Sequence, residues 1–184
     1  MARIRAQWRR LEPVVASSKN EAVREWLEDL DGSEVERGTY VIRLARPFTI
    51  SYPSARSPVL YIGEGSTRKR LEQHLTSWIS KLGQMIPQAK IDARICQPRV
   101  QRNENAYREV EADLLSVFCE RYGALPLFNR NKEYFGTPNS YSQSFLSVLN
   151  PGKGKGFESA LEPLGKREPK FRAYKSWRTV EVFN

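Results

Sequence analysis

The stretch VLYIGEGSTRKRLEQHLTSWISKLG, residues 59–83, predicts a strand, a glycine turn and an amphipathic helix in direct succession. VLYIG (59–63) combines β-branched and aromatic residues and stops at glycines, which is typical of a strand. Ser66 or Thr67 can cap the helix that follows, and Gly83 is expected to end it. The apolar positions of this helix recur at helical spacing and are Leu71, Leu75, Trp78, Ile79 and Leu82.

Two further strands are predicted on either side of this stretch. GTYVIRLAR (38–46) follows a glycine and is rich in β-branched and aromatic residues, so we expect it to pair antiparallel with 59–63. The connection between them, PFTISYPSARS (47–57), is punctuated by prolines and indicates a long loop or an irregular hairpin. AKIDARICQP (89–98) alternates apolar and charged residues and predicts a strand with one solvated face.

A second strong helix is predicted from about Asn105 to Tyr122, with Gly123 as its C-terminal cap. The order strand, strand, helix, strand, helix predicts an α+β fold in a domain spanning residues 38–130. Residues 1–37 are charged and carry helical spacing in SKNEAVREWLEDL, so we expect an N-terminal helical extension. Residues 131–184 form a basic C-terminal extension.

Composition narrows the class of protein. The chain has 184 residues and a formal net charge of +9, which suits one domain with extensions that meets phosphate or another anionic surface. It contains no apolar run of about 18 residues, so we expect no membrane partner, and its N-terminus lacks a secretory signal. Cys96 and Cys119 are expected to be core thiols in a reducing cytoplasm. One histidine and two scattered cysteines argue against zinc.

Glu111 is unusual because helical geometry places it in the middle of an apolar stripe, between Tyr107 and Leu115. Glu109 and Asp113 are expected to point to the opposite, solvated side. A carboxylate that faces a core is costly unless it is paired or bound to a cation. The residues alone leave two alternatives for Glu111, a buried salt bridge and a ligand for a hard metal ion.

The chain's single histidine, His74, lies four residues after Arg70, so both occupy one helix face. One interpretation is an exposed basic turn, because Arg68 and Lys69 are adjacent. The other is a site after a strand end, in which a guanidinium binds phosphate and an imidazole assists proton transfer. Two tyrosines, one in each predicted strand, each lie near a glycine and could face the same patch.

These residues, in order, resemble the GIY-YIG nuclease superfamily. The matching segments are Gly38-Thr39-Tyr40, Tyr61-Ile62-Gly63, Arg70-Leu71 with His74, Glu111 in EADLL, and Asn129 at the end of PLFN. The resemblance covers roughly residues 38–130. It implies a small three-stranded antiparallel sheet flanked by helices, and metal-dependent hydrolysis of a DNA phosphodiester.

The resemblance also implies a role for each matched residue. Glu111 would hold one Mg²⁺ or Mn²⁺, and Arg70 would hold the scissile phosphate. Tyr40 would deprotonate or position the attacking water with Tyr61 beside it, in basic surroundings that favour the phenolate. His74 would accept a proton from the phenol or orient it, and Asn129 would orient a group in the site.

Further cations are candidates for DNA contact, because they adjoin Arg70 at the start of the helix or alternate with aromatic residues in the tail. They are Arg68, Lys69, Lys170, Arg172, Lys175 and Arg178. The alternative function is a non-catalytic nucleic-acid-binding module on the same fold, and a third is a basic scaffold protein in a larger complex. The sequence leaves open whether the protein forms a homodimer or a larger complex.

Overall fold

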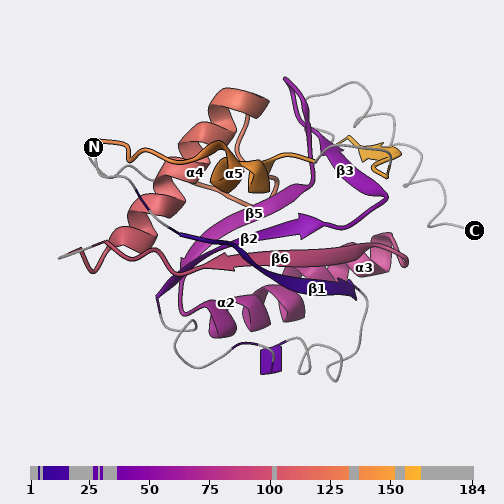
Figure 1. Ribbon diagram of the computed structural model, residues 1–184. Helices are drawn as coiled ribbons and strands as arrows, with labels where there is room; N and C mark the ends of the chain where they lie inside the picture. The colour runs from indigo at the N-terminus through magenta and orange to yellow at the C-terminus, as the bar shows by residue number, and fades with distance from the viewer. Residues whose placement is uncertain are drawn as a thin grey trace, which may run out of the picture.

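The computed structural model shows an α+β protein built on a four-stranded antiparallel sheet with the strand order β1-β6-β2-β5 (Figure 1). The strands are β1 (Arg9–Val15), β2 (Gly38–Leu44), β5 (Val59–Gly65) and β6 (Lys90–Cys96). The structure describes residues 4, 6–16, 27–28, 30, 37–100, 103–132, 137–151 and 156–162. β2 is buried along its whole length, because it is an inner strand whose two faces are both covered.

Strand β1 corrects the expectation of a three-stranded sheet behind a helical N-terminal extension. Residues 9–15 pair antiparallel with β6, from Arg9 opposite Ile95 to Val15 opposite Lys90. Leu11 of this strand is almost completely buried. The pairing satisfies backbone groups that β6 would otherwise expose at a sheet edge. Most of the helix expected from the SKNEAVREWLEDL pattern lies outside the described residues. Within this stretch, residues 27–28 are described as helical.

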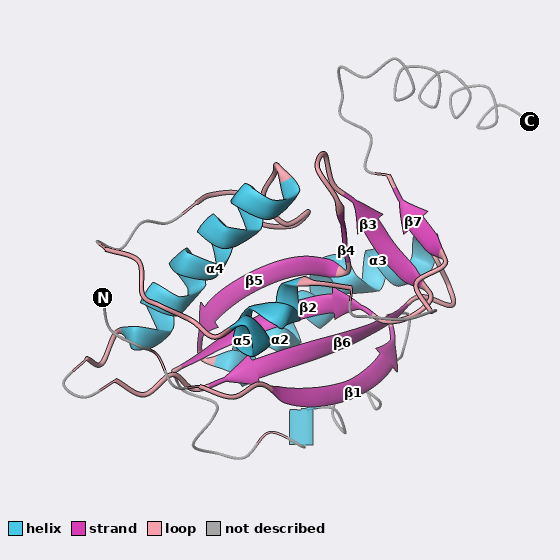
Figure 2. Cartoon of the chain, turned by 45° about the horizontal axis from the view of Figure 1, so that its top comes forward, coloured by secondary structure: helices cyan, strands magenta, loops and turns pink. Residues whose placement is uncertain are grey.

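The stretch after β5 forms one continuous helical segment on one face of the sheet (Figure 2). It consists of α2 (Thr67–His74), the π-helical turn η1 (Leu75–Ile79) and α3 (Ser80–Met85). The predicted apolar positions Leu71, Leu75, Ile79 and Leu82 are buried. Gly83 was expected to end the helix, but the helix continues through it to Met85 because the glycine is itself buried against the core.

The second long helix, α4 (Ala106–Tyr122), agrees with the sequence prediction at both ends. Asn105 is its N-cap residue, and Gly123 ends it in the left-handed conformation with φ of 76°. Glycine adopts that conformation without the steric cost of a Cβ atom. The helix packs on β2 and β5, and the Thr39 hydroxyl donates to the Tyr107 carbonyl at its first turn.

The proline-rich connection between β2 and β5 forms a second small sheet, whose strands are β3 (Phe48–Ser51), β4 (Arg56–Ser57) and β7 (Ser159–Leu161). β7 runs parallel to β3 although about 110 residues separate them. Helix α5 (Gln143–Leu146) and the 3₁₀ turn η2 (Ser147–Leu149) also pack against the body of the protein. The described part of the C-terminal extension therefore shares the core of residues 38–130.

Among the described residues, no helix has the length and apolarity that a membrane crossing would need. Cys96 is buried and Cys119 is half-buried, and both thiols are free, as the sequence predicts. Burial raises the pKa of the Cys96 thiol, so this group behaves as part of the core.

Candidate functional site

Strand register brings the two tyrosines together. Tyr40 of β2 lies opposite Gly63 of β5, and Ile42 lies opposite Tyr61, so both phenol rings project from the same face of the sheet. Their ring centroids are 6.0 Å apart. Tyr40 is completely buried, whereas Tyr61 is half-buried. Tyr61 is therefore the phenol of this pair that solvent or a substrate can reach.

Gly63 makes the approach of the two phenols possible. A Cβ atom at this position would lie 2.5 Å from Cε1 of Tyr61 and 2.6 Å from the Tyr40 hydroxyl oxygen. Both distances are far below van der Waals contact. The glycine of the Tyr61-Ile62-Gly63 motif therefore leaves the space that the Tyr40 ring occupies.

Replacing Gly63 by alanine is expected to displace both phenols and to lower the free energy of unfolding by about 1–3 kcal/mol, the usual cost of overpacking a core. Urea denaturation would measure the loss. Gly65→Ala is a useful contrast, because the Cβ atom there has open space and the only cost is backbone strain at φ of 105°. Equal stability of wild type and Gly63→Ala would show that the phenols can move at little cost.

His74 links Tyr40 to a tryptophan. The His74 Nε2 atom lies 3.0 Å from the Tyr40 hydroxyl oxygen, and the Trp78 indole N–H donates to His74 Nδ1 at 2.8 Å. Trp78 belongs to the π-helical turn that begins directly after His74. Such turns are rare and often occur at functional sites. Helical periodicity predicted Trp78 only as a member of the apolar stripe, although its spacing of four residues from His74 was a signal for this contact.

The tautomer of His74 follows from this contact. An indole nitrogen can only donate, so Nδ1 must be the accepting, unprotonated nitrogen. In the neutral ring Nε2 then carries the proton and donates it to the Tyr40 oxygen. Burial, followed by the charge of Arg70, lowers the pKa of His74 to about 4, so the ring is neutral at pH 7. Of the two roles expected for His74, the geometry favours orienting the phenol over accepting its proton.

NMR of the imidazole nitrogens should show the Nε2–H tautomer and a pKa of about 4, and the assignment is simple because the chain has one histidine. Since the folded pKa lies below the ordinary value of about 6.5, the unfolded chain binds the additional proton between those pH values. The stability contributed by His74 is thus present above pH 6.5 and is lost as the pH falls toward 4. Trp78→Phe should give mixed tautomers, and a wild-type Nδ1–H form would refute the assignment.

Arg70 and Glu111 act on the same two phenols. The exposed Arg70 directs its Nη2 atom toward the Tyr61 hydroxyl oxygen at 3.5 Å, and its charge lowers the pKa of both tyrosines. Glu111 lies on α4 and is 7% exposed. Its negative charge raises the pKa of both tyrosines. The helical-face argument from the sequence therefore placed this carboxylate correctly on the inner side of α4.

The basic surroundings expected for Tyr40 and Tyr61 are not the largest effect on the pKa of either phenol. Burial is the largest effect on each tyrosine and raises the pKa of Tyr40 and of Tyr61 above the ordinary value of 10. Hydrogen bonds from Arg70 and Tyr40 lower the pKa of Tyr61 in part. Both phenols are thus protonated at neutral pH, and Tyr61 is distinguished from Tyr40 by its exposure and by the Arg70 guanidinium beside its oxygen.

The Asn129 side chain binds the backbone of the strand that carries Tyr61. Its side-chain oxygen accepts from the Ile62 N–H at 2.9 Å, and its amide nitrogen donates to the Ile62 carbonyl at 2.8 Å. The amide thereby pairs with the free edge of β5 between Tyr61 and Gly63. The adjacent Phe128 stacks on Trp78 with ring centroids 4.0 Å apart. Residues 128–129 therefore hold β5 and the Trp78 ring in place.

Asp113 departs from the sequence expectation, which placed it with Glu109 on a solvated face. Asp113 is buried, and its carboxylate accepts from the Asn139 N–H at 3.0 Å and from the Tyr141 hydroxyl. Glu109 accepts from the Asn139 side chain at 3.1 Å. The helical periodicity was correct, but a segment about 26 residues further along the chain covers that side of α4.

The residues of the candidate site determine which kind of metal they would fit. Within the described ranges, no three His, Cys, Asp or Glu side chains gather as a metal cluster. A single carboxylate fits Mg²⁺ or Mn²⁺, which retain water and share substrate phosphate oxygens, and does not fit zinc. Glu111 is the carboxylate whose charge reaches both phenols.

Two of the cations expected to contact DNA, Arg68 and Lys69, are exposed in the first turn of α2. The tail cations of the same set, Lys170, Arg172, Lys175 and Arg178, lie outside the described residues. Comparison of the chain with protein-family models, with curated proteins and with solved structures gives no match. The geometry of the site therefore supplies the evidence for function.

Proposed function

We propose that this protein is a metal-dependent endonuclease that hydrolyses DNA phosphodiester bonds. The observation that supports the proposal is the convergence of Tyr40, Tyr61 and His74 in direct contact, with Arg70 and Glu111 acting on the same phenols. A base, a phosphate-binding cation and a hard oxygen ligand are the groups that phosphodiester hydrolysis requires. The net charge of +9 favours an anionic substrate.

Glu111 would hold the Mg²⁺ or Mn²⁺ ion, which when bound supplies Lewis-acid stabilisation of the leaving oxygen. Arg70 binds a non-bridging oxygen of the scissile phosphate, because its guanidinium is exposed and stands beside Tyr61. Arg70 also stabilises the additional negative charge that develops on those oxygens when water attacks phosphorus.

Hydrogen bonds form a chain that ends at Tyr40. The Trp78 indole donates to His74, and neutral His74 donates to the Tyr40 oxygen. The Tyr40 ring lies 6.0 Å from the Tyr61 ring, centroid to centroid, and the Tyr40 hydroxyl lowers the pKa of Tyr61. Tyr61, in its phenolate form, takes the proton of the attacking water. Tyr40, Trp78 and His74 position and polarise the Tyr61 phenol. The remaining pKa elevation makes the phenolate a minor species at neutral pH.

Arg70→Ala is expected to lower the turnover number by about 10²-fold, the usual effect of losing a preorganised charge stabiliser. Single-turnover cleavage of a labelled duplex at saturating protein would measure it. Lys81→Ala is the matched control, because Lys81 is an exposed cation of the same helical segment. Equal rates for Arg70→Ala and wild type would make Arg70 a surface cation.

The first test is incubation of the full chain with supercoiled plasmid, with Mg²⁺ or Mn²⁺ and with EDTA. Nicked or linear product that depends on the metal is expected. Salt-sensitive DNA binding without any cleavage would favour the alternative, a non-catalytic nucleic-acid-binding module. The raised pKa of both tyrosines is the observation that favours this alternative.

A further inference from the structure

A second cationic site lies on the face of the sheet opposite the tyrosines. Residues alternate along β2, so Arg43 points away from the face that carries Tyr40 and Ile42. A cavity of about 940 Å³ on that far face is lined by five cationic side chains and one carboxylate. These are Arg10, Arg43, Arg46, Lys90, Arg94 and Asp92.

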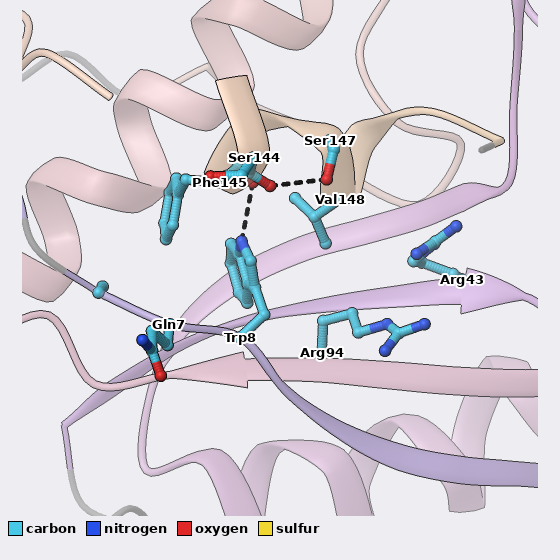
Figure 3. Close-up of a pocket in the computed structure, with 9 residues that line it drawn as sticks. Gln7, Trp8, Arg43, Arg94, Ser144, Phe145, Ser147 and Val148 are labelled. Atoms are coloured by element: carbon cyan, nitrogen blue, oxygen red, sulfur yellow. Dashed lines mark hydrogen bonds between the residues drawn. The ribbon is translucent and has the colours of Figure 1, made fainter. Parts of the chain in front are cut away.

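A second cavity of about 490 Å³ adjoins the first and shares Arg43, Arg94 and Ser147 with it (Figure 3). Its upper wall is the segment that carries Phe145 and Ser147, which the Trp8 indole anchors by donating to the Phe145 carbonyl at 2.8 Å. Figure 3 shows the Arg94 guanidinium extending along the sheet toward Arg43. The two arginines thus stand at the junction of both cavities.

Arg43 has hydrogen-bonding capacity to spare. Arg43 is 8% exposed, and its Nη2 atom donates to the Asn150 carbonyl at 3.2 Å. The Arg43 Nε atom is buried and has no hydrogen-bond partner among the residues that the structure describes, whereas the buried Arg94 Nε atom faces Asp92 Oδ1 at 3.6 Å. A buried donor without a partner is costly. An acceptor entering the cavity would recover that cost.

Asp92, the carboxylate that lines the cavity, does not neutralise the five cationic side chains around it. Asp92 lies opposite Arg43 in the sheet, 3.6 Å from Arg94 Nε and 3.9 Å from Arg10 Nη2, so three guanidinium groups share one carboxylate. Glu12 is a further acidic residue whose charge acts on Asp92 and Arg94. The cavity therefore retains a positive charge that an anion can balance.

We propose that this cavity binds a phosphate group carried by a small ligand the size of a mononucleotide. Guanidinium groups match phosphate oxygens in geometry, and a cavity of this volume suits a ligand of that size. Phe157 lines the same cavity, with Arg46 over its ring at 5.7 Å, and offers an apolar surface for the remainder of the ligand. The same phosphate chemistry could be presented by a nucleic-acid strand.

The test is titration of the full chain, in low salt and without divalent metal, with inorganic phosphate, adenosine monophosphate and a tetranucleotide in turn. Isothermal calorimetry should show saturable binding of phosphate and tighter binding of the monophosphate. Arg94→Gln should weaken both by at least about 10-fold, in line with the loss of a charged hydrogen-bond pair. Arg46→Gln, an exposed position that should not affect folding, should weaken them in the same direction.

Arg56→Gln is the control, because Arg56 is exposed and does not line the cavity. Tighter binding of the tetranucleotide than of the monophosphate would identify a strand as the source of the phosphate. Absence of saturable phosphate binding, or binding by Arg94→Gln and Arg46→Gln that equals wild type, would overturn the proposal. The measurement involves neither metal nor cleavage, so its result is independent of the proposed nuclease activity.

Discussion

Replacing Glu111 by glutamine should reduce metal-dependent DNA cleavage by about 10³-fold, which corresponds to roughly 4 kcal/mol of transition-state stabilisation. Glutamine retains the shape of the side chain but removes the charge that would hold the cation. Glu111 is 7% exposed on the inner side of α4, and its charge reaches both phenols. The described residues contain no group of three or more His, Cys, Asp or Glu side chains that could replace it as a metal site.

The fold and the affinity for DNA should be unchanged in Glu111→Gln, because the substitution removes one negative charge and almost no volume. Far-ultraviolet circular dichroism and fluorescence anisotropy with a labelled duplex in EDTA would establish both. Glu120→Gln is the matched control, since Glu120 is an exposed carboxylate of the same helix. Full cleavage by Glu111→Gln would remove this residue from the metal site and restore the salt-bridge alternative.

Tyr61→Phe should lower the cleavage rate by about 10³-fold, within the range usual for loss of a general base. Tyr61 is the half-buried phenol, and the Arg70 Nη2 atom lies 3.5 Å from its oxygen. Because its pKa is raised, the phenolate fraction grows with pH, and the wild-type rate should rise about tenfold per pH unit near neutrality. Tyr61→Phe should lose this dependence.

Tyr40→Phe is the comparison that separates the two phenols. It keeps the ring over Gly63 but breaks the hydrogen-bond chain from His74, so we expect a loss of about 10-fold and a retained pH dependence. Rates at saturating metal between pH 6 and pH 9 would distinguish the variants. The reverse order, with Tyr40→Phe the more damaged and flat in pH, would assign the proton transfer to Tyr40.

Much of the local structure could be predicted because its signals lie within a few residues of each other. Strand β5 follows from the strand propensity of its residues, and helix α2 follows from the periodicity of its apolar residues. The end of α4 at Gly123 follows from the backbone freedom of glycine. The expected antiparallel pairing of 38–46 with 59–63 allowed Tyr40 and Tyr61 to share one patch, and the observed register places them on the same face.

Strand β1, the buried state of Asp113 and the role of Asn129 could not be predicted in this way. Each depends on a partner far along the chain: the free edge of β6, the cover supplied by Asn139 and Tyr141, and the free edge of β5. In residues 9–15, Pro13 disfavours a helix and Val14 and Val15 favour a strand, so a local signal was present. The pairing itself depends on β6, which lies far along the chain.

The sequence by itself determined which chemical groups the site contains and the order in which the chain supplies them. The tertiary structure decided the pKa values and the tautomeric state of those groups. Burial raises the pKa of both tyrosines, and the Trp78 indole selects the tautomer of His74. A sequence pattern contains only residue types at fixed spacing. Desolvation and the direction of hydrogen bonds depend on which residues pack around a group in three dimensions.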